Sequence, residues 1–334
     1  MKISDIVNSY GENHTPYQGN LVNHLPMGQL AVYKLTKDLE KTKSYSELYI
    51  ENRDINKVKE FFDEVENFED TLGERSQYES LLSFLKKEIT HNNVYYYIEK
   101  MLNDYPLGMS SGLFHVLIRL AYAYEGYELD RDYLPEVRRA VAYYITAYRE
   151  ADQFTRKVIG DDILKEASSL YSNTEVQRIL SEKNSLGQKM KALYDNKEYM
   201  QNGFVVDGGE DAKLKAVLNL SLNAYLNSGS IVALHCITAT HALIVLKTFQ
   251  KYFNKNIDIL TTCILTHLIA AELGDYKTSN YSLEELSWDD LNYKIEEEKD
   301  VHAVKLDYTA QVLNNLYPDD RYIVSAAKRL HKLK

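Results

Sequence analysis

Apolar residues recur along most of the chain at the three- and four-residue spacing of helices. In Ser76–Ile89, residues such as Leu81 and Leu85 fall on one stripe, which is typical of a helix with one buried face. Asp130–Ala151 is amphipathic in the same way. It carries Pro135 in its first turn, where proline is tolerated because the first N–H groups of a helix have no internal partner. Both segments are therefore predicted to be helices that bury one face.

Other segments are apolar on nearly every side. Gly112–Glu125 reads GLFHVLIRLAYAYE, and a helix that is apolar all round is expected at the centre of a fold. Ile257–Leu273 is similar, and Ser230–Phe253 opens with the nearly apolar run SIVALHCITATHAL. The longest apolar stretches are interrupted by Arg119 or by threonine and histidine, and they are shorter than the roughly 20 residues that span a bilayer. We therefore expect central helices and no membrane partner.

The rest of the chain follows the same helical pattern, except that residues 1–26 are predicted to be irregular because they hold four glycines and prolines. The other predicted helices are one from Met27 on, Glu47–Glu74, Val94–Leu102, Ala212–Asn227, Leu283–Glu297, Val301–Leu316 and a basic last helix ending KRLHKLK. No strand-like alternation, internal repeat or linker is visible. The pattern predicts an all-α fold, a single large domain over residues 1–334 with about a dozen helices.

Composition agrees with long helices and excludes some classes of function. The 334 residues include only 14 glycines and 5 prolines, so turns are few. The formal net charge of -10 argues against a nucleic-acid binder, which needs clustered Lys and Arg. Cys236 and Cys263 lie in apolar helical segments, as buried thiols of a reducing compartment do. The N-terminus has no apolar core of signal-peptide length, so we expect a cytoplasmic protein.

Several common catalytic motifs are absent. The chain has no GxGxxG, P-loop, HExxH or CxxC. Of its nine histidines, the candidates in apolar or structurally constrained segments are His24, His115, His235 and His302. Lys305 follows His302 by three positions, so the two share one face of a helix.

Two interpretations of these residues remain open at this point. A single histidine on an apolar helix is commonly a core residue satisfied by one hydrogen bond, and Lys305 can reach water from a surface helix. Alternatively, the histidines form a buried metal site. An ammonium beside a divalent ion is repelled, but burial favours the neutral amine, which can add CO2 to give an anionic carbamate ligand.

Four blocks carry a resemblance to a known family. NHLPM, GLFHVLIRLAYAYE, ALHCIT and HAVKL occur in this order at wide spacing, and the chain from about residue 10 to 330 resembles the questin oxidase-like family. Fungal members of that family oxidise anthraquinones, and one of them cleaves the ring.

The resemblance implies a non-haem Fe(II) site that uses O2 as co-substrate. Its ligands, carried over residue by residue, are four histidines and a carboxylated lysine: His24, His115, His235, His302 and Lys305. His241 follows His235 by six positions, points to a different helix face and is left out. A need for NADPH has been described for the first characterised member, but no fingerprint for it is present here and NADPH is not assigned.

Arg119 lies one turn after His115 in the second block. As a catalytic residue it would position a phenolate or an anionic oxygen species. The equally weighted alternative is that it pairs with Glu125 or another buried acid.

Three functions are compatible with these patterns. The first is a metal-dependent oxygenase that acts on an aromatic or quinone-like small molecule. The second is a non-catalytic all-α binding protein that keeps the fold. The third is a metal-dependent hydrolase, since a carboxylated lysine with histidines also suits two-metal hydrolytic sites. Against the third, the only acid in the four blocks is Glu125, the last residue of the second block. The sequence gives no indication of the oligomeric state.

Overall fold

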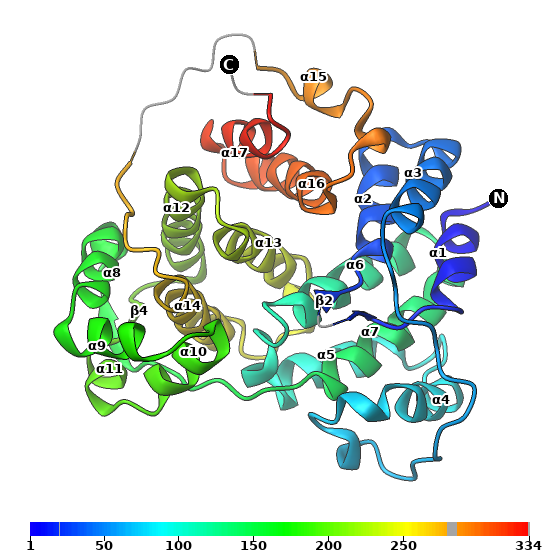
Figure 1. Ribbon diagram of the computed structural model, residues 1–334, viewed down its shortest axis with the longest axis horizontal. Coiled ribbons are helices and arrows are strands. Elements are labelled where there is room, and N and C mark those ends of the chain that lie inside the picture. Colours follow the sequence, from blue (N-terminus) through cyan, green and yellow to red (C-terminus); the bar gives the residue numbers. More distant parts are fainter. Residues whose placement is uncertain (20, 279–285, 333–334) are drawn as a thin grey trace.

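The protein is described by a computed structural model over residues 1–19, 21–278 and 286–332. This part of the chain is mostly helical (Figure 1), which confirms the predicted all-α class. Its α-helices are α1 (Ile3–Gly11), α2 (Leu25–Thr36), α3 (Leu39–Glu51), α4 (Tyr78–Glu88), α5 (Val94–Asp104), α6 (His115–Leu129), α7 (Leu134–Thr146), α8 (Ile163–Tyr171), α9 (Thr174–Glu182), α10 (Leu186–Tyr194), α11 (Lys197–Asn202), α12 (Glu210–Ser228), α13 (Ile231–Val245), α14 (Phe253–Ala270), α15 (Trp288–Asn292), α16 (Val301–Leu316) and α17 (Arg321–Arg329).

The strands are few and short. β1 (Tyr17–Gln18) pairs antiparallel with β2 (Leu21–Val22), and β3 (Arg156–Val158) pairs parallel with β4 (Phe204–Val206). Short 3-10 helices cover Glu69–Thr71, Arg75–Gln77, Pro106–Gly108, Arg131–Tyr133, Gly160–Asp162, Lys247–Phe249 and Ile295–Glu297.

Four helices from distant parts of the chain form the centre of the fold. α2 packs on α6, α6 on α13, α13 on α16, and α16 back on α2, so that the four close a ring. Figure 1 shows them grouped together, with α3, α7, α12 and α17 around them. Two of the four, α6 and α13, are the segments that were predicted to be central from their all-round apolar sequence.

The ring is wrapped by amphipathic helices that each bury one face. α7 packs on α6 and α4, α17 packs on α16 and α12, and α14 packs on α12 and α13. The buried apolar side chains of these helices form one core cluster. In the described ranges every helix is too short or too polar to reach across a bilayer.

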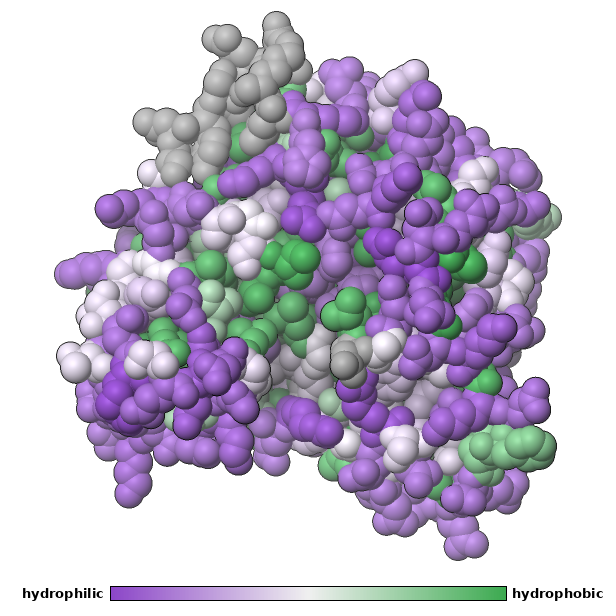
Figure 2. Space-filling view, viewed as in Figure 1, coloured by the Kyte–Doolittle hydropathy of each residue, from purple (hydrophilic) through white to green (hydrophobic). Residues whose placement is uncertain are grey.

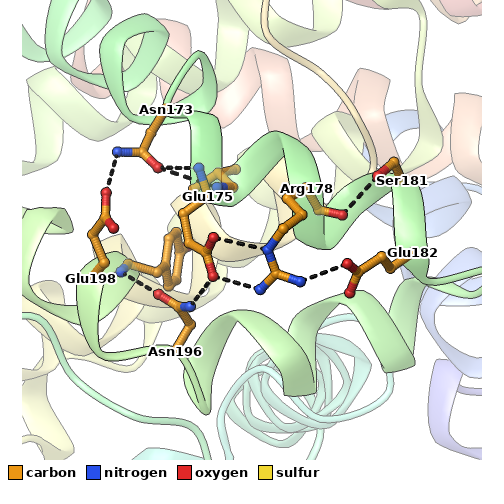
Figure 3. A network of polar contacts seen from close by, with 9 residues as sticks. Asn173, Glu175, Arg178, Ser181, Glu182, Asn196 and Glu198 are labelled. Atoms are coloured by element: carbon orange, nitrogen blue, oxygen red, sulfur yellow. Dashed lines mark hydrogen bonds and ion pairs between the residues drawn. The ribbon is translucent and has the colours of Figure 1, made fainter.

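A peripheral group of helices, α8 to α11, is linked by polar contacts at its surface. Asn173 caps α9, where its side-chain oxygen accepts from the Glu175 N–H at 2.9 Å. Arg178 bridges Glu175 and Glu182 along the same helix at 2.5 and 2.6 Å, as Figure 3 shows. These side chains are largely exposed, so the network orders the surface more than it stabilises the fold.

Several element predictions need correction. The structure describes seventeen α-helices where about a dozen were expected. Residues 1–26 are not irregular, because α1 buries Ile3, Ile6 and Val7 and is followed by the β1–β2 hairpin. The predicted helix Glu47–Glu74 is wrong beyond α3, which ends at Glu51, since the acidic segment that follows has too few apolar residues to bury a helical face.

Two other predicted helices are shorter than expected. Ser230–Phe253 is a helix only to Val245, because Gln250 turns back and donates its side-chain amide to the Leu243 carbonyl at 2.9 Å, which ends this helix before α14 begins. In Leu283–Glu297, residues 283–285 lie outside the described ranges, and the α-helix within the remainder is α15.

Candidate metal centre

Four histidines meet where the helices of the ring begin. One ring nitrogen from each lies within 4.8 Å of those of the other three, and the four are His24, His115, His235 and His302. His24 precedes α2, His115 opens α6, and His302 is the second residue of α16, while His235 lies one turn into α13. The structure thus brings together all four histidines that the sequence singled out.

The imidazole rings are in direct contact with one another. Ring centroids are 4.5 Å apart for His24 and His115, 4.4 Å for His115 and His235, and 4.7 Å for His24 and His302. His24, His115 and His235 are buried, and the side chain of His302 is 17% exposed. The cluster therefore lies close beneath the surface, with His302 on its outer side.

Each ring also has its own hydrogen-bond acceptor at Nδ1. The pairs are His24 with the Val22 carbonyl at 2.7 Å, His235 with the Ile231 carbonyl at 2.8 Å, His302 with Asp300 Oδ1 at 3.0 Å, and His115 with the Gly112 carbonyl. Because carbonyl and carboxylate oxygens only accept, each Nδ1 carries the proton and donates it. This leaves a lone pair on every Nε2, the tautomer that a metal ligand needs.

The Nε2 atoms are left without suitable partners. Those of His24 and His115 lie 2.6 Å apart, although neither carries a proton if both Nδ1 atoms donate. The His235 Nε2 is buried and has no hydrogen-bond partner in the described residues. Lone pairs at this distance repel each other unless a proton or a cation lies between them. The donor set therefore fits a metal ion that prefers imidazole nitrogen.

Local sequence explains how His24 is held. Asn23 accepts a hydrogen bond from the Leu25 N–H at 3.0 Å and donates its amide to the Thr15 carbonyl at 3.0 Å. The His24 N–H donates to the Tyr49 hydroxyl at 3.1 Å, and Pro26 is in the first turn of α2. The Asn-His pair of the first sequence block is thus the start of a helix that fixes the ring.

The turn before His115 has unusual backbone geometry. Gly112, Leu113 and Phe114 have φ of +59°, +58° and +64°, a left-handed conformation that costs energy for residues other than glycine. Packing maintains it, because Phe114 is fully buried and its ring lies 4.6 Å from that of His267. The turn presents the Gly112 carbonyl to the His115 ring, so the strained backbone orients this histidine.

Asp300 holds one of the four clustered histidines, and it was not among the residues predicted from the sequence. It caps α16 by accepting from the His302 N–H at 3.0 Å, holds the His302 ring, and pairs its other oxygen with Arg329 at 2.6 Å. Burial raises the pKa of Asp300, but the bond and charge of His302 and the charge of Arg329 outweigh burial and bring the pKa to about 2. The Asp-x-His spacing at a predicted helix start was the available signal.

Lys305 lies one turn after His302 and is fully buried. Its Nζ has no hydrogen-bond partner in the part of the chain that the structure describes. Burial lowers the pKa of Lys305 to about 7. The pKa values of all four clustered histidines are lowered, first by burial and also by the charge of Lys305. The amine is thus part of the same electrostatic site as the imidazoles.

Arg119 has a buried acid as its partner, and the acid is Glu136 rather than Glu125. Its Nε donates to Glu136 Oε1 at 2.8 Å, and Arg139 donates to the second oxygen at 2.7 Å. The Nη1 of Arg119 is buried without a hydrogen-bond partner among the described residues. Glu125 instead contacts Lys34, at 3.4 Å, and the Tyr308 hydroxyl. A positioning role for Arg119 remains a prediction.

His241 does not join the cluster. It is buried on α13, its Nδ1 lies 3.4 Å from Thr309 Oγ1, and its imidazole is outside the group of four. The six-residue spacing from His235 predicted this separation.

Comparison with known proteins supports the family. Residues 21–131 match a family model described as questin oxidase-like. No curated protein matched the chain. The matched segment contains His24, His115 and Arg119, while the blocks around His235 and His302 lie beyond it. Residues 21–131 are thus similar to the questin oxidase-like family, the resemblance that the first two sequence blocks carry.

Proposed function

We propose that the protein is an oxidoreductase whose four clustered histidines and Lys305 hold one Fe(II) for the reaction of O2 with an aromatic or quinone-like small molecule. The observation that carries the proposal is the convergence of one ring nitrogen from each of the four histidines within 4.8 Å. The Nε2 atoms of His24 and His115 lie 2.6 Å apart, and that of His235 has no partner in the described residues. The questin oxidase-like match favours an oxidase or oxygenase. When bound, ferrous iron would supply the one-electron chemistry that O2 needs to react with an organic molecule.

The fifth ligand in this proposal is a carbamate on Lys305. Its buried amine has no partner, and as an ammonium it would repel a divalent ion. Addition of CO2 to the neutral amine forms an N–C bond and releases one proton, which leaves an anionic oxygen donor. The repulsive neighbour thereby becomes an attractive one.

The protein residues orient the ligands. The Nδ1 acceptors hold each imidazole in the tautomer with a free Nε2, and Asp300 with Arg329 does so for the most exposed ring. The N-terminal ends of α2, α6 and α16 lie at the cluster, and their partial positive charge favours an anion there. Arg119, anchored by Glu136, is proposed to position an anionic oxygen of the substrate through its free Nη1.

The competing functions fit these observations less well. A two-metal hydrolase uses several carboxylates, and the group of candidate ligands among the described residues contains only histidines. A structural role for the histidines is favoured by the carbonyl partners of His115 and His235. That role, however, leaves the Nε2 atoms and the Lys305 amine buried at an uncompensated cost.

The test is metal analysis of protein purified without a histidine tag. We expect about one iron per chain, as isolated or after anaerobic reconstitution with ferrous iron and bicarbonate. His302→Ala and Lys305→Ala should lose the metal and keep the helical circular dichroism spectrum. His241→Ala, which removes a buried histidine outside the cluster, should keep the metal. Wild-type protein that stays metal-free after reconstitution would refute the proposal.

The carbamate on Lys305 can be tested separately by isotope labelling. Protein reconstituted in ¹³C-bicarbonate should show a carbamate carbon signal that is absent from Lys305→Ala. An unlabelled wild-type protein that nevertheless binds iron would mean that Lys305 is not carboxylated.

A further inference from the structure

A pocket of about 650 Å³ adjoins the turn that holds His115. It lies between α10, the residues before α6 and the connection after α7, and Leu113, Ala151, Leu186, Met190 and Tyr194 give it apolar walls. Figure 2 shows hydrophobic surface in the middle of the visible face, over the region where Figure 1 places α13 and α14. The volume is in the range of small-molecule sites.

One wall of the pocket carries an oriented histidine that the metal site does not use. His267 of α14 is 2% exposed, and its Nδ1 donates to the Cys263 carbonyl at 2.7 Å. This bond fixes the tautomer, so Nε2 is an acceptor, and the described residues provide no donor for it. Burial lowers the pKa of His267 to about 4, and the ring is therefore neutral near pH 7.

The charges around the pocket disfavour an anionic ligand. Its cations are Arg149, whose Nη1 donates to the Gly73 carbonyl at 2.8 Å, and Lys191, which lies 3.9 Å from Asp195. Glu150 and Asp152 add two further acids to the lining. The lining thus holds more acids than cations, which disfavours an anion, and burial of any charge against the apolar walls is costly. The ligand that fits is therefore uncharged, with apolar surface for the walls and a donor for the buried imidazole.

The pocket is physically continuous with the support of the metal cluster. Gly112 lines the pocket, and its carbonyl accepts the hydrogen bond from His115. Phe114 packs against the His267 ring. An occupant would therefore touch the peptide segment that orients one of the four clustered histidines.

We propose that this pocket binds a neutral, hydroxylated ring compound whose hydroxyl donates to Nε2 of His267 while the ring packs between Leu113, Leu186 and Met190. The proposal rests on the pocket and on the geometry of His267 and does not require a bound metal. It adds a binding site to the proposed function and makes His267 a specificity-determining residue.

The experiment measures the affinities of three probes of equal ring size by calorimetric titration of the full chain. We expect 1-naphthol to bind roughly 3- to 10-fold more tightly than 1-methoxynaphthalene, which lacks the donor, since one hydrogen bond contributes about that much. The anion 1-naphthoate should bind most weakly. In His267→Phe the preference for the hydroxyl should vanish, and His267→Gln, which keeps an acceptor, should retain part of it.

A pair of tryptophan variants locates the site. Met190→Trp fills the pocket and should abolish binding of the two neutral probes. Leu316→Trp makes a similar change at an exposed residue beside a different cavity and should leave binding unchanged. Equal affinity of wild type for 1-naphthol and 1-methoxynaphthalene, tighter binding of 1-naphthoate, or undiminished binding to Met190→Trp would each overturn the proposal.

The same titration separates this inference from the proposed function. Metal-free Lys305→Ala should bind 1-naphthol as wild type does, because the pocket does not include the metal ligands. A wild-type protein that binds the probe but never iron would refute only the iron site. One that binds iron but no probe would refute only the pocket.

Discussion

Lys305 has the most costly environment of the five proposed ligands. It is completely buried on a central helix, and its amine lacks a partner among the described residues. This cost is explained if the amine reacts with CO2 and the carbamate then binds the metal. A residue kept for function in this way lowers the stability of the metal-free protein. If Lys305 had only a structural role, an apolar residue in its place would not reduce the stability of the protein.

Lys305→Met should stabilise the metal-free protein. The change removes an unsatisfied buried donor while keeping a similar side-chain length, so we expect the free energy of unfolding in chelator to rise by about 1–3 kcal/mol. Urea unfolding measures it. The control is Lys213→Met, which removes a buried lysine that has a partner, Asp258, at 2.6 Å and should destabilise. A loss of stability in both variants would contradict the assigned environment of Lys305.

Glu136 is the charge on which two buried arginines depend. It accepts from Arg119 and Arg139 at 2.8 and 2.7 Å, and all three side chains are at most 5% exposed. Glu136→Gln should lower the free energy of unfolding by about 3–5 kcal/mol, because it leaves two guanidinium groups in the core without a counter-charge. Denaturant unfolding gives the value.

The matched control for Glu136→Gln is Glu175→Gln on α9. Glu175 also pairs with an arginine, Arg178, but at the surface (Figure 3), so this variant should unfold almost as wild type does. Equal losses of stability in the two variants would show that burial does not determine the effect of Glu136→Gln.

At the scale of elements, the turn Gly112–Phe114 links backbone strain to the proposed metal centre. Three successive left-handed residues aim one carbonyl at the His115 ring, and Phe114 locks them into the core. Helical periodicity predicted α6 but not this turn, because a run of positive φ depends on packing around it and not on local propensity.

Gly112→Ala should weaken both the fold and the metal site. The new Cβ takes a left-handed φ and would lie 2.7 Å from the Tyr143 hydroxyl oxygen, which predicts a loss of about 1–2 kcal/mol or more in unfolding free energy. Displacement of the carbonyl that holds His115 should also reduce iron affinity by on the order of 10-fold. Thermal unfolding and competition with a chelator measure the two effects.

Gly187→Ala is the control for this substitution. Gly187 is in α10, and an added Cβ meets no atom within 4 Å, so stability should stay the same or rise by about 0.5–1 kcal/mol. Unchanged iron affinity in Gly112→Ala would mean that the turn does not orient His115.

At the scale of the whole molecule, the ring of α2, α6, α13 and α16 creates the site. Each helix supplies one histidine near its start. The neighbouring helices α17 and α7 supply Arg329 and Glu136, which pair with Asp300 at the start of α16 and with Arg119 of α6. A metal bound among the four helices would link the N-terminal part of the chain to its C-terminal part.

Iron should therefore stabilise the whole molecule. Ligand linkage predicts a gain of about 2.7 kcal/mol in unfolding free energy when free Fe(II) is 100 times its Kd. Anaerobic calorimetry should show a rise in Tm with added iron and a return to the starting value with chelator. The Tm of His302→Ala should not respond. A response of equal size in that variant would place the stabilising ion elsewhere.

The sequence by itself determined the helical class, most of the long helices, the histidines that cluster and the exclusion of His241. These features depend on short-range periodicity and on which face of a helix a residue occupies, and both are local properties of the chain. Prediction was poorest where local signals are weak, as in α1, the β1–β2 hairpin and the acidic segment after α3. The structure of these segments depends on contacts with the rest of the fold.

Only the tertiary structure decided what these residues do together. His24 and His115 are 91 positions apart, and no spacing rule brings their Nε2 atoms to 2.6 Å. Helix packing selected Glu136 of α7, rather than Glu125 of α6 itself, as the partner of Arg119. Packing also left the Lys305 amine without a partner and opened the pocket beside His267. Convergence, burial and unsatisfied hydrogen bonds arise between elements, and they exist only once the ring of helices has closed.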